Sequence, residues 1–223
     1  GTSLPVLLPM GLHHFEAWNE ALSEGAWGEW VRPAAEWMRQ VVDLEHWAAF
    51  QASFQELCRM VVEVATGRRG APPATVCFLS GDVHHSYLAE ADLAEAGLGE
   101  AGLGDAGVGA AAAGQSHPGR SRLLQAVCSP MRNRLPRAIR LASTVSVRSL
   151  AWRVGLLAAR AAKVPDPPFR WSTTDGPWFD NALATMHIEG RRAWLRWDTA
   201  QVDTSTDGGP DVQVRPLHGV RLT

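Results

Sequence analysis

Apolar residues recur along several stretches of the chain at the spacing of an amphipathic helix. This periodicity predicts a short helix over 13–21 and a long helix from Pro33 to Ala65. The apolar stripe of the long helix consists of Trp37, Val41, Leu44, Trp47, Phe54, Leu57, Val61 and Val64. A third helical stretch is expected between Leu135 and Ala162, and its second half is apolar and rich in arginine.

Continuous or alternating apolar runs predict the strands. The run 75–79 is bounded by turn residues and has the pattern of a central strand that is buried on both faces. Further strands are expected at 4–8, 87–91, 123–128, 182–188, 192–198 and 212–222, with a turn at 207–210. Trp194 and Trp197 should point to opposite faces of one strand. Helices and strands alternate and then give way to an antiparallel meander, which indicates a layered α/β domain.

Composition narrows the class of protein. The 223 residues are 46% hydrophobic and 20% charged, with a formal net charge of -2, which is ordinary for a globular chain. Without a long basic run there is no nucleic-acid-binding signature, and no apolar run is long enough to span a membrane. The ten tryptophans should pack in a core or line a cleft, and Cys58, Cys77 and Cys128 should be reduced thiols.

Two segments bear on the organisation of the chain. Residues 95–109 repeat a five-residue, glycine-rich unit and an alanine run follows, so we expect a flexible surface insertion over 94–119. The chain opens on the apolar run 4–8 without an initiator methionine or a signal peptide. We therefore expect a fragment of a larger protein, and a cytoplasmic location.

The most informative chemistry follows the predicted strand 75–79. Gly81 is followed by Asp82 and by His84 and His85, so that a strand delivers a carboxylate and an imidazole two residues apart into a tight loop. This pair of ligand types suits Zn, Mn or Fe. By spacing alone, the same residues could equally cap a turn and bond to the backbone.

Other polar residues are candidates for a site or for the core. His14, next to His13 at the start of the first helix, is either a core group or a contact for substrate or metal. Asp43 and His46 share a helix face in the predicted long helix, which favours a buried hydrogen-bond network. Arg132 could contact a phosphate, since guanidinium matches phosphate in a bidentate manner, or it could lie on the surface.

Cys128 and Arg134 have the spacing of the cysteine phosphatases. That chemistry needs a thiolate cradled by backbone N–H groups, but Pro130 removes one donor and the loop contains no glycine. A core cysteine at a strand end explains Cys128 better.

The segment Leu79-Ser80-Gly81-Asp82-Val83-His84-His85-Ser86-Tyr87 resembles the final metal-site motif of the PhoD-like (alkaline phosphatase D) phosphatases. Segments similar to the same family lie at 1–5, 13–20, 43–50, 125–133 and 175–181. The resemblance implies a calcineurin-like metallophosphoesterase fold, an α/β arrangement in which helices flank a β-sandwich. It also implies two metal ions (Zn, Mn, Fe or Ca) and the hydrolysis of small phosphomonoesters or phosphodiesters.

The resemblance implies roles residue by residue. Asp82 and His84 would be metal ligands, and His85 a third ligand or a proton donor to the leaving alkoxide. Arg132 and His14 are added to the expected site as substrate contacts on the strength of their residue types and positions, not of the resemblance. The remaining ligands of the family come from motifs N-terminal to the matched region. We therefore expect this chain to need an upstream half for activity; the alternative is a catalytically inactive remnant or binding module.

Overall fold

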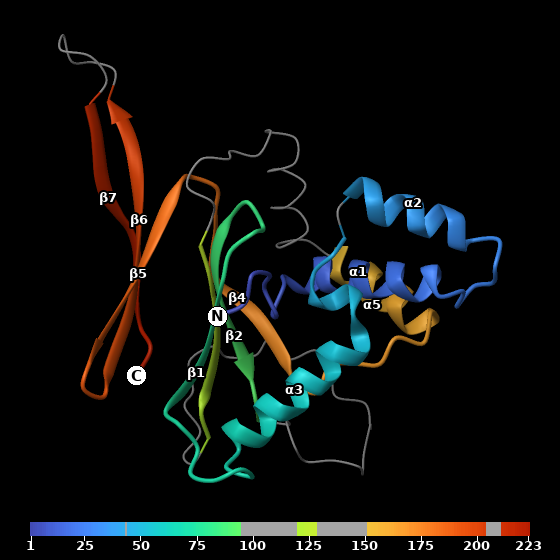
Figure 1. Cartoon of the computed structure of the whole chain (residues 1–223), viewed down its shortest axis with the longest axis horizontal. Coiled ribbons are helices and arrows are strands. Elements are labelled where there is room, and N and C mark those ends of the chain that lie inside the picture. The colour runs from blue at the N-terminus through green and yellow to red at the C-terminus, as the bar shows by residue number, and fades with distance from the viewer. Residues whose placement is uncertain (43, 95–119, 129–150, 204–210) are drawn as a thin grey trace.

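The computed structural model describes residues 1–42, 44–94, 120–128, 151–203 and 211–223 (Figure 1). Two β-sheets lie side by side, and the helices cover the face of the first sheet that points away from the second (Figure 1). This confirms a mixed α/β class. The expected insertion at 95–119, the helix start at 135–150 and the turn at 207–210 lie outside the described residues.

The helices differ from the prediction in one place. Helix α1 spans Met10–Ser23, which confirms and extends the helix expected at 13–21. The single long helix is wrong: α2 (Arg32–Val42) and α3 (Gln51–Ala65) are separate, with the 3-10 helix η1 (Trp47–Ala49) between them.

The apolar stripe does not cross this break. Trp37 and Val41 on α2 are 65% and 61% exposed, whereas Phe54 on α3 is fully buried. Leu44 and Ala48, in the connection between α2 and α3, are buried. Helix α2 therefore ends where the chain turns and carries these apolar side chains into the core. Sequence periodicity cannot detect such a turn when both flanking helices continue the same spacing.

The first sheet has the strand order β1-β3-β2-β4. Its strands are β1 (Thr75–Ser80), β2 (Ser86–Asp92), β3 (Arg122–Val127) and β4 (Arg170–Trp178). Strand β1 runs parallel to β3, and the other neighbours are antiparallel. Strand β4 is not among the strands expected from the sequence, and Gly176 and Pro177 lie in its second half.

Strand β1 corrects the central position expected for 75–79. It pairs with β3 on one side only in the described sheet, and all of its residues are half-buried. Its end is held on the outer side by the start of the chain, because Thr2 N–H donates to the Leu79 carbonyl and Gly81 N–H to the Ser3 carbonyl, at 2.9 and 3.3 Å. An apolar run indicates that a strand packs against a hydrophobic core, but it does not indicate whether the strand has neighbours on one side or on both.

The second sheet is the expected antiparallel meander. It consists of β5 (Ala182–Glu189), β6 (Arg192–Asp203) and β7 (Asp211–Arg221) in this order. Trp197 is fully buried and Trp194 is 37% exposed, so the two indoles do point to opposite faces of β6.

Two cores join these layers. The larger one lies between the helices and the first sheet and contains Phe54, Tyr87 and Trp171. The smaller one, around Leu124 and Trp197, lies between the two sheets. The last helix, α5 (Ala151–Ala161), packs against α1 on the outer side of the larger core.

The opening segment 4–8 is buried but is not a strand. Val6, Leu7 and Leu8 have no exposed surface, as their apolar character predicts. Their backbone groups bond to side chains: Leu7 O accepts from the Tyr87 hydroxyl at 3.0 Å and Leu8 O from the Trp171 indole at 2.6 Å. Side chains from two strands thus satisfy a buried backbone that flanking prolines keep out of the sheet.

Two further expectations concern membrane-spanning helices and the state of the cysteines. No helix within the described residues is long and apolar enough to cross a membrane. All three cysteines are thiols, and burial raises the pKa of Cys58 to about 12 and that of Cys77 to about 11.

Candidate functional site

The loop at 81–85 follows the C-terminal end of β1 and turns sharply into β2. Asp82 and His84 adopt left-handed backbone conformations, with φ of 61° and 56°. Such conformations cost a non-glycine residue about 1 kcal/mol or more and persist where the surrounding structure imposes them. Because strained residues gather at functional sites, the loop is the first place to look for chemistry.

His85 is held in one tautomer. Its Nδ1 lies 2.7 Å from the Val83 carbonyl oxygen, which can only accept, so Nδ1 carries the proton and Nε2 keeps its lone pair. Nε2 is buried and has no hydrogen-bond partner among the described residues. The ring stacks against Tyr87 and contacts Phe179, with centroids 5.4 and 5.6 Å away.

The surroundings keep this imidazole neutral. Burial, partly offset by the hydrogen bond to Val83, lowers the pKa of His85 to about 4. A neutral imidazole with a committed Nδ1–H and an available Nε2 is the form that binds metal ions.

Asp82 and His84 differ in exposure. The Asp82 side chain is exposed, and His84 is half-buried with an Nδ1 that is buried and lacks a hydrogen-bond partner among the described residues. In the part of the chain that the structure describes, no three His, Cys, Asp or Glu side chains converge in a way that could hold a metal ion. The residue types therefore fit metal binding individually, and a complete ligand set would need donors beyond them.

His13 and His14 lie in the buried part of α1. His13 packs between the rings of Phe54 and Trp171, at centroid distances of 4.8 and 4.9 Å, and burial lowers its pKa to about 3. His14 faces α5, where a methyl group on Gly155 would come within 3.2 Å of the His14 Cβ. Both are core residues of the helical layer.

A buried acidic residue on α1 was missed by the sequence analysis. Glu16 is fully buried and accepts a hydrogen bond of 2.6 Å from Nδ1 of His46. This agrees with the network expected around His46, although Asp43 lies outside the described residues. Glu16 follows His13 by three residues on the same helix face, and this buried polar periodicity is the signal that could have revealed it.

Glu20 continues the polar side of α1 by one further turn. Its carboxylate accepts from the backbone N–H of Gln51, at 3.1 and 3.2 Å, in the first turn of α3. Burial raises the pKa of Glu20 to about 6. The acidic residues of α1 thus hold the connection between α2 and α3 in place.

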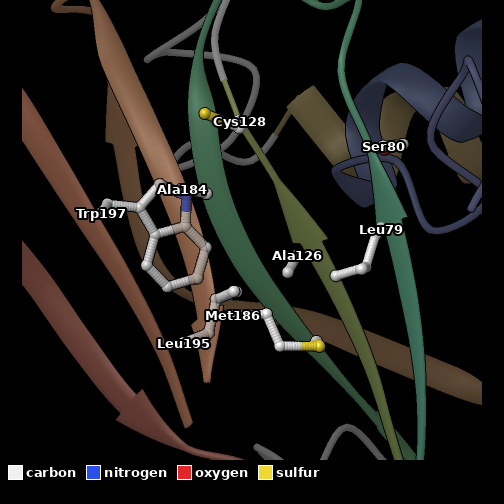
Figure 2. Close-up of a pocket in the computed structure, with 8 residues that line it drawn as sticks. All are labelled: Leu79, Ser80, Ala126, Cys128, Ala184, Met186, Leu195 and Trp197. Atoms are coloured by element: carbon white, nitrogen blue, oxygen red, sulfur yellow. The ribbon is translucent and has the colours of Figure 1, made fainter. Parts of the chain in front are cut away.

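A cavity of about 210 Å³ opens between the two sheets (Figure 2). It is lined by Leu79, Ser80, Ala126, Cys128, Ala184, Met186, Leu195 and Trp197. Its wall is mainly apolar and includes none of the loop residues Asp82, His84 and His85.

Burial raises the pKa of the Cys128 thiol, which is the opposite of what a nucleophilic thiolate needs. Arg132 and Arg134 lie outside the described residues. Of the candidate site residues, His85 and its neighbours in the loop therefore remain the best supported by their geometry. The role of Arg132 stays a prediction from the sequence.

Comparisons with known proteins return no matching family model, no matching curated protein and no matching solved structure.

Proposed function

We propose that this chain is part of a metal-dependent phosphoesterase that hydrolyses phosphomonoesters or phosphodiesters, and that it needs ligands from an upstream half. The observation that carries the proposal is the state of His85, whose Nδ1–H is bonded to Val83 O while its buried Nε2 has no hydrogen-bond partner among the described residues. A buried lone pair without a donor is costly, and a metal ion would satisfy it. The resemblance of the loop to the PhoD-like metal motif supports the same conclusion.

In this proposal Asp82 and His84 hold metal, and His85 is a third ligand. The tautomer of His85 favours this role over proton donation, since Nε2 carries no proton to give. Two bound metal ions would supply an activated water and neutralise charge on the phosphoryl oxygens. The strained backbone at Asp82 and His84 supports a loop shaped for ligand placement rather than for stability.

The two-sheet arrangement with helices on one outer face is compatible with the metallophosphoesterase sandwich that the motif suggests. The second candidate is an inactive remnant or binding module of the same fold. It is favoured by the lack of a converging set of three ligands in the described part of the chain. The two candidates differ in whether added upstream sequence restores metal binding and turnover.

The test measures bound metal and hydrolysis of a nitrophenyl phosphoester. The 223-residue chain alone should bind Zn²⁺ or Mn²⁺ weakly, because stable sites need about four ligands, and should show negligible turnover. Supplying the upstream half, in one chain or by co-expression, should raise both. His84→Ala should then abolish turnover, whereas His187→Ala, at an exposed histidine of β5, should not.

Two results would contradict the proposal in different ways. Stoichiometric metal and full turnover in the 223-residue chain would disprove the need for upstream ligands. Full activity of the completed protein with His84→Ala would disprove the ligand role of this loop.

A further inference from the structure

Strand β1 has an open edge. Among the described strands it pairs only with β3, and it is the outermost strand of the first sheet (Figure 2). The carbonyls of Ala74 and Ser80 accept from backbone N–H groups at the two ends of β3, so the even-numbered residues of β1 bond to β3 in this parallel ladder. The N–H and C=O groups of Thr75, Cys77 and Leu79 therefore point to the open side.

Only the end of this open side is occupied. The Leu79 carbonyl accepts from Thr2 N–H at 2.9 Å, and Gly81 N–H donates to the Ser3 carbonyl at 3.3 Å. No other backbone hydrogen bond between described residues reaches this side, which leaves both backbone groups of Cys77 and the N–H of Leu79 without a backbone partner there. All residues of β1 are half-buried, where an unpaired backbone group is costly.

The edge of β1 also lacks the features that keep sheet edges from pairing, which are charged side chains, prolines and bulges. The opposite edge strand, β4, contains Pro177 and has register shifts against β2. In the second sheet, β7 contains Pro216 and has a register shift against β6. Strand β1 has no charged residue and no proline, and its register with β3 is continuous. Such an edge is suited to accept a further strand.

The side chains of β1 define the kind of strand that fits. Val76 and Phe78 pack against the larger core, between the helices and the first sheet, whereas Cys77 and Leu79 pack against the smaller core between the sheets. A neighbour on the open side lies between the same two layers, so both of its faces contact apolar side chains. The strand that fits is therefore a continuous apolar run of about five residues, the pattern of a strand buried on both faces.

The opening residues indicate where such a strand comes from. Thr2 and Ser3 bond to β1 in ascending order, so the chain runs along the open side in the same direction as β1. Gly1 lies beside Leu79, because a Cβ at Gly1 would be 3.8 Å from the Leu79 carbonyl oxygen. A segment that enters at Gly1 in this direction passes along the open backbone groups of Cys77.

We propose that the open edge of β1 is a docking site for a strand, and that its occupant is the segment that directly precedes Gly1 in the upstream half. The segment runs parallel to β1 and turns it from an edge strand into an interior one. A second copy of β1 fits less well, because residues 1–3 already occupy the edge at 79–81. The inference rests on the proposed function, which requires an upstream half, and adds how that half attaches beside the strand that leads into the loop 81–85.

The experiment measures amide hydrogen exchange in β1 by NMR. It compares the 223-residue chain with the same chain extended by the about ten residues that precede Gly1 in its reading frame, which should contain the apolar run. In the 223-residue chain, the amides of Cys77 and Leu79 should exchange at least about tenfold faster than those of Val76 and Phe78, which bond to β3. In the extended chain this difference should disappear.

Two controls show whether strand pairing causes the protection. A glycine–serine extension of the same length has no apolar side chains and little tendency to form a strand, so it should leave the Cys77 amide in fast exchange. Cys77→Pro removes an N–H on the open side and none that bonds to β3. In the extended chain it should restore faster exchange at Leu79. If circular dichroism shows that Cys77→Pro is unfolded, the glycine–serine extension carries the comparison.

The outcomes separate this inference from the proposed function. Fast exchange of Cys77 and Leu79 with the native extension, or a preceding segment without an apolar run, overturns the inference; the proposed function stands if the completed protein binds Zn²⁺ and hydrolyses the nitrophenyl phosphoester. Protection of both amides in a completed protein without metal or turnover overturns the proposed function and leaves the strand pairing.

Slow exchange of both amides in the 223-residue chain itself also overturns the inference. Gel filtration then identifies the occupant of the edge, because a dimer indicates a second copy and a monomer indicates another part of the same chain.

Discussion

The side-chain oxygen of Gln125 accepts a hydrogen bond of 2.9 Å from the backbone N–H of Val6, which ties the interior strand β3 to the buried opening segment. The same oxygen lies 3.3 Å from Leu7 N, and the Gln125 amide nitrogen donates to Phe78 O and to Ser80 Oγ on β1. One fully buried side chain therefore connects the start of the chain to the strand that precedes the candidate loop.

Replacing Gln125 by leucine should destabilise the protein by about 3 kcal/mol, because two buried backbone donors and two acceptors lose their partner. The free energy of unfolding can be measured by urea titration. Gln213→Leu, at an exposed position of β7, is the matched control and should change it by less than about 0.5 kcal/mol. Equal effects of the two substitutions would show that Gln125 does not have this role.

The buried His13 should make the protein acid-sensitive. Its pKa is lowered from 6.5 to about 3, so the unfolded chain binds a proton at a pH where the folded chain does not. The stability contributed by the neutral ring is fully present above pH 6.5 and is lost as pH falls toward 3. At pH 5 the loss is about 2 kcal/mol relative to pH 7.5.

The measurement compares urea unfolding at pH 7.5 and at pH 5.0. His13→Gln, which cannot ionise, should flatten the decline, whereas His187→Gln on the surface should leave it unchanged. Part of the effect is opposed by Glu20, whose raised pKa favours the folded state at low pH. A wild-type protein that is equally stable at both pH values would contradict the neutral buried state of His13.

Glycine at position 82 should stabilise the fold and weaken the site. Asp82 and Lys163 are both exposed and both have φ of 61°, so replacing either by glycine removes the steric cost of a left-handed conformation. We expect about 0.5–1 kcal/mol of stabilisation in each case, after allowing for the greater freedom of glycine in the unfolded chain. Only Asp82→Gly should reduce Zn²⁺ affinity, as measured by calorimetry; a similar loss in Lys163→Gly would dissociate metal binding from Asp82.

Gly176 allows β4 to approach β2 beside His85. A Cβ at this position would lie 2.9 Å from the Ser86 carbonyl oxygen and 3.1 Å from the Tyr87 Cα, and its φ is 98°. Gly176→Ala should therefore cost more than about 2 kcal/mol. Gly190→Ala also has a positive φ but meets open space, so it should cost only about 1 kcal/mol. Thermal unfolding of the two variants compares them directly, and a Gly176→Ala protein as stable as Gly190→Ala would rule out the steric argument.

Much of the local structure could be predicted from the chain itself. The apolar runs located β2, β3 and the three strands of the second sheet to within a few residues, except that β6 continues five residues beyond its predicted end. Helical periodicity located α1 and α3. The order Gly81, Asp82, His84 identified the loop as a candidate site, although the spacing alone did not distinguish metal ligands from residues that cap a turn.

The sequence alone determined which segments are apolar and where ligand-type residues are concentrated; only the tertiary structure decided how these segments meet. The edge position of β1, the turn between α2 and α3 and the buried but irregular segment 4–8 all depend on neighbours distant in the chain. The same holds for the Glu16–His46 pair, whose members are thirty residues apart. Hydrophobicity acts without direction and specifies burial, whereas the pairing of strand edges and of buried polar atoms depends on distances that exist only in the folded chain.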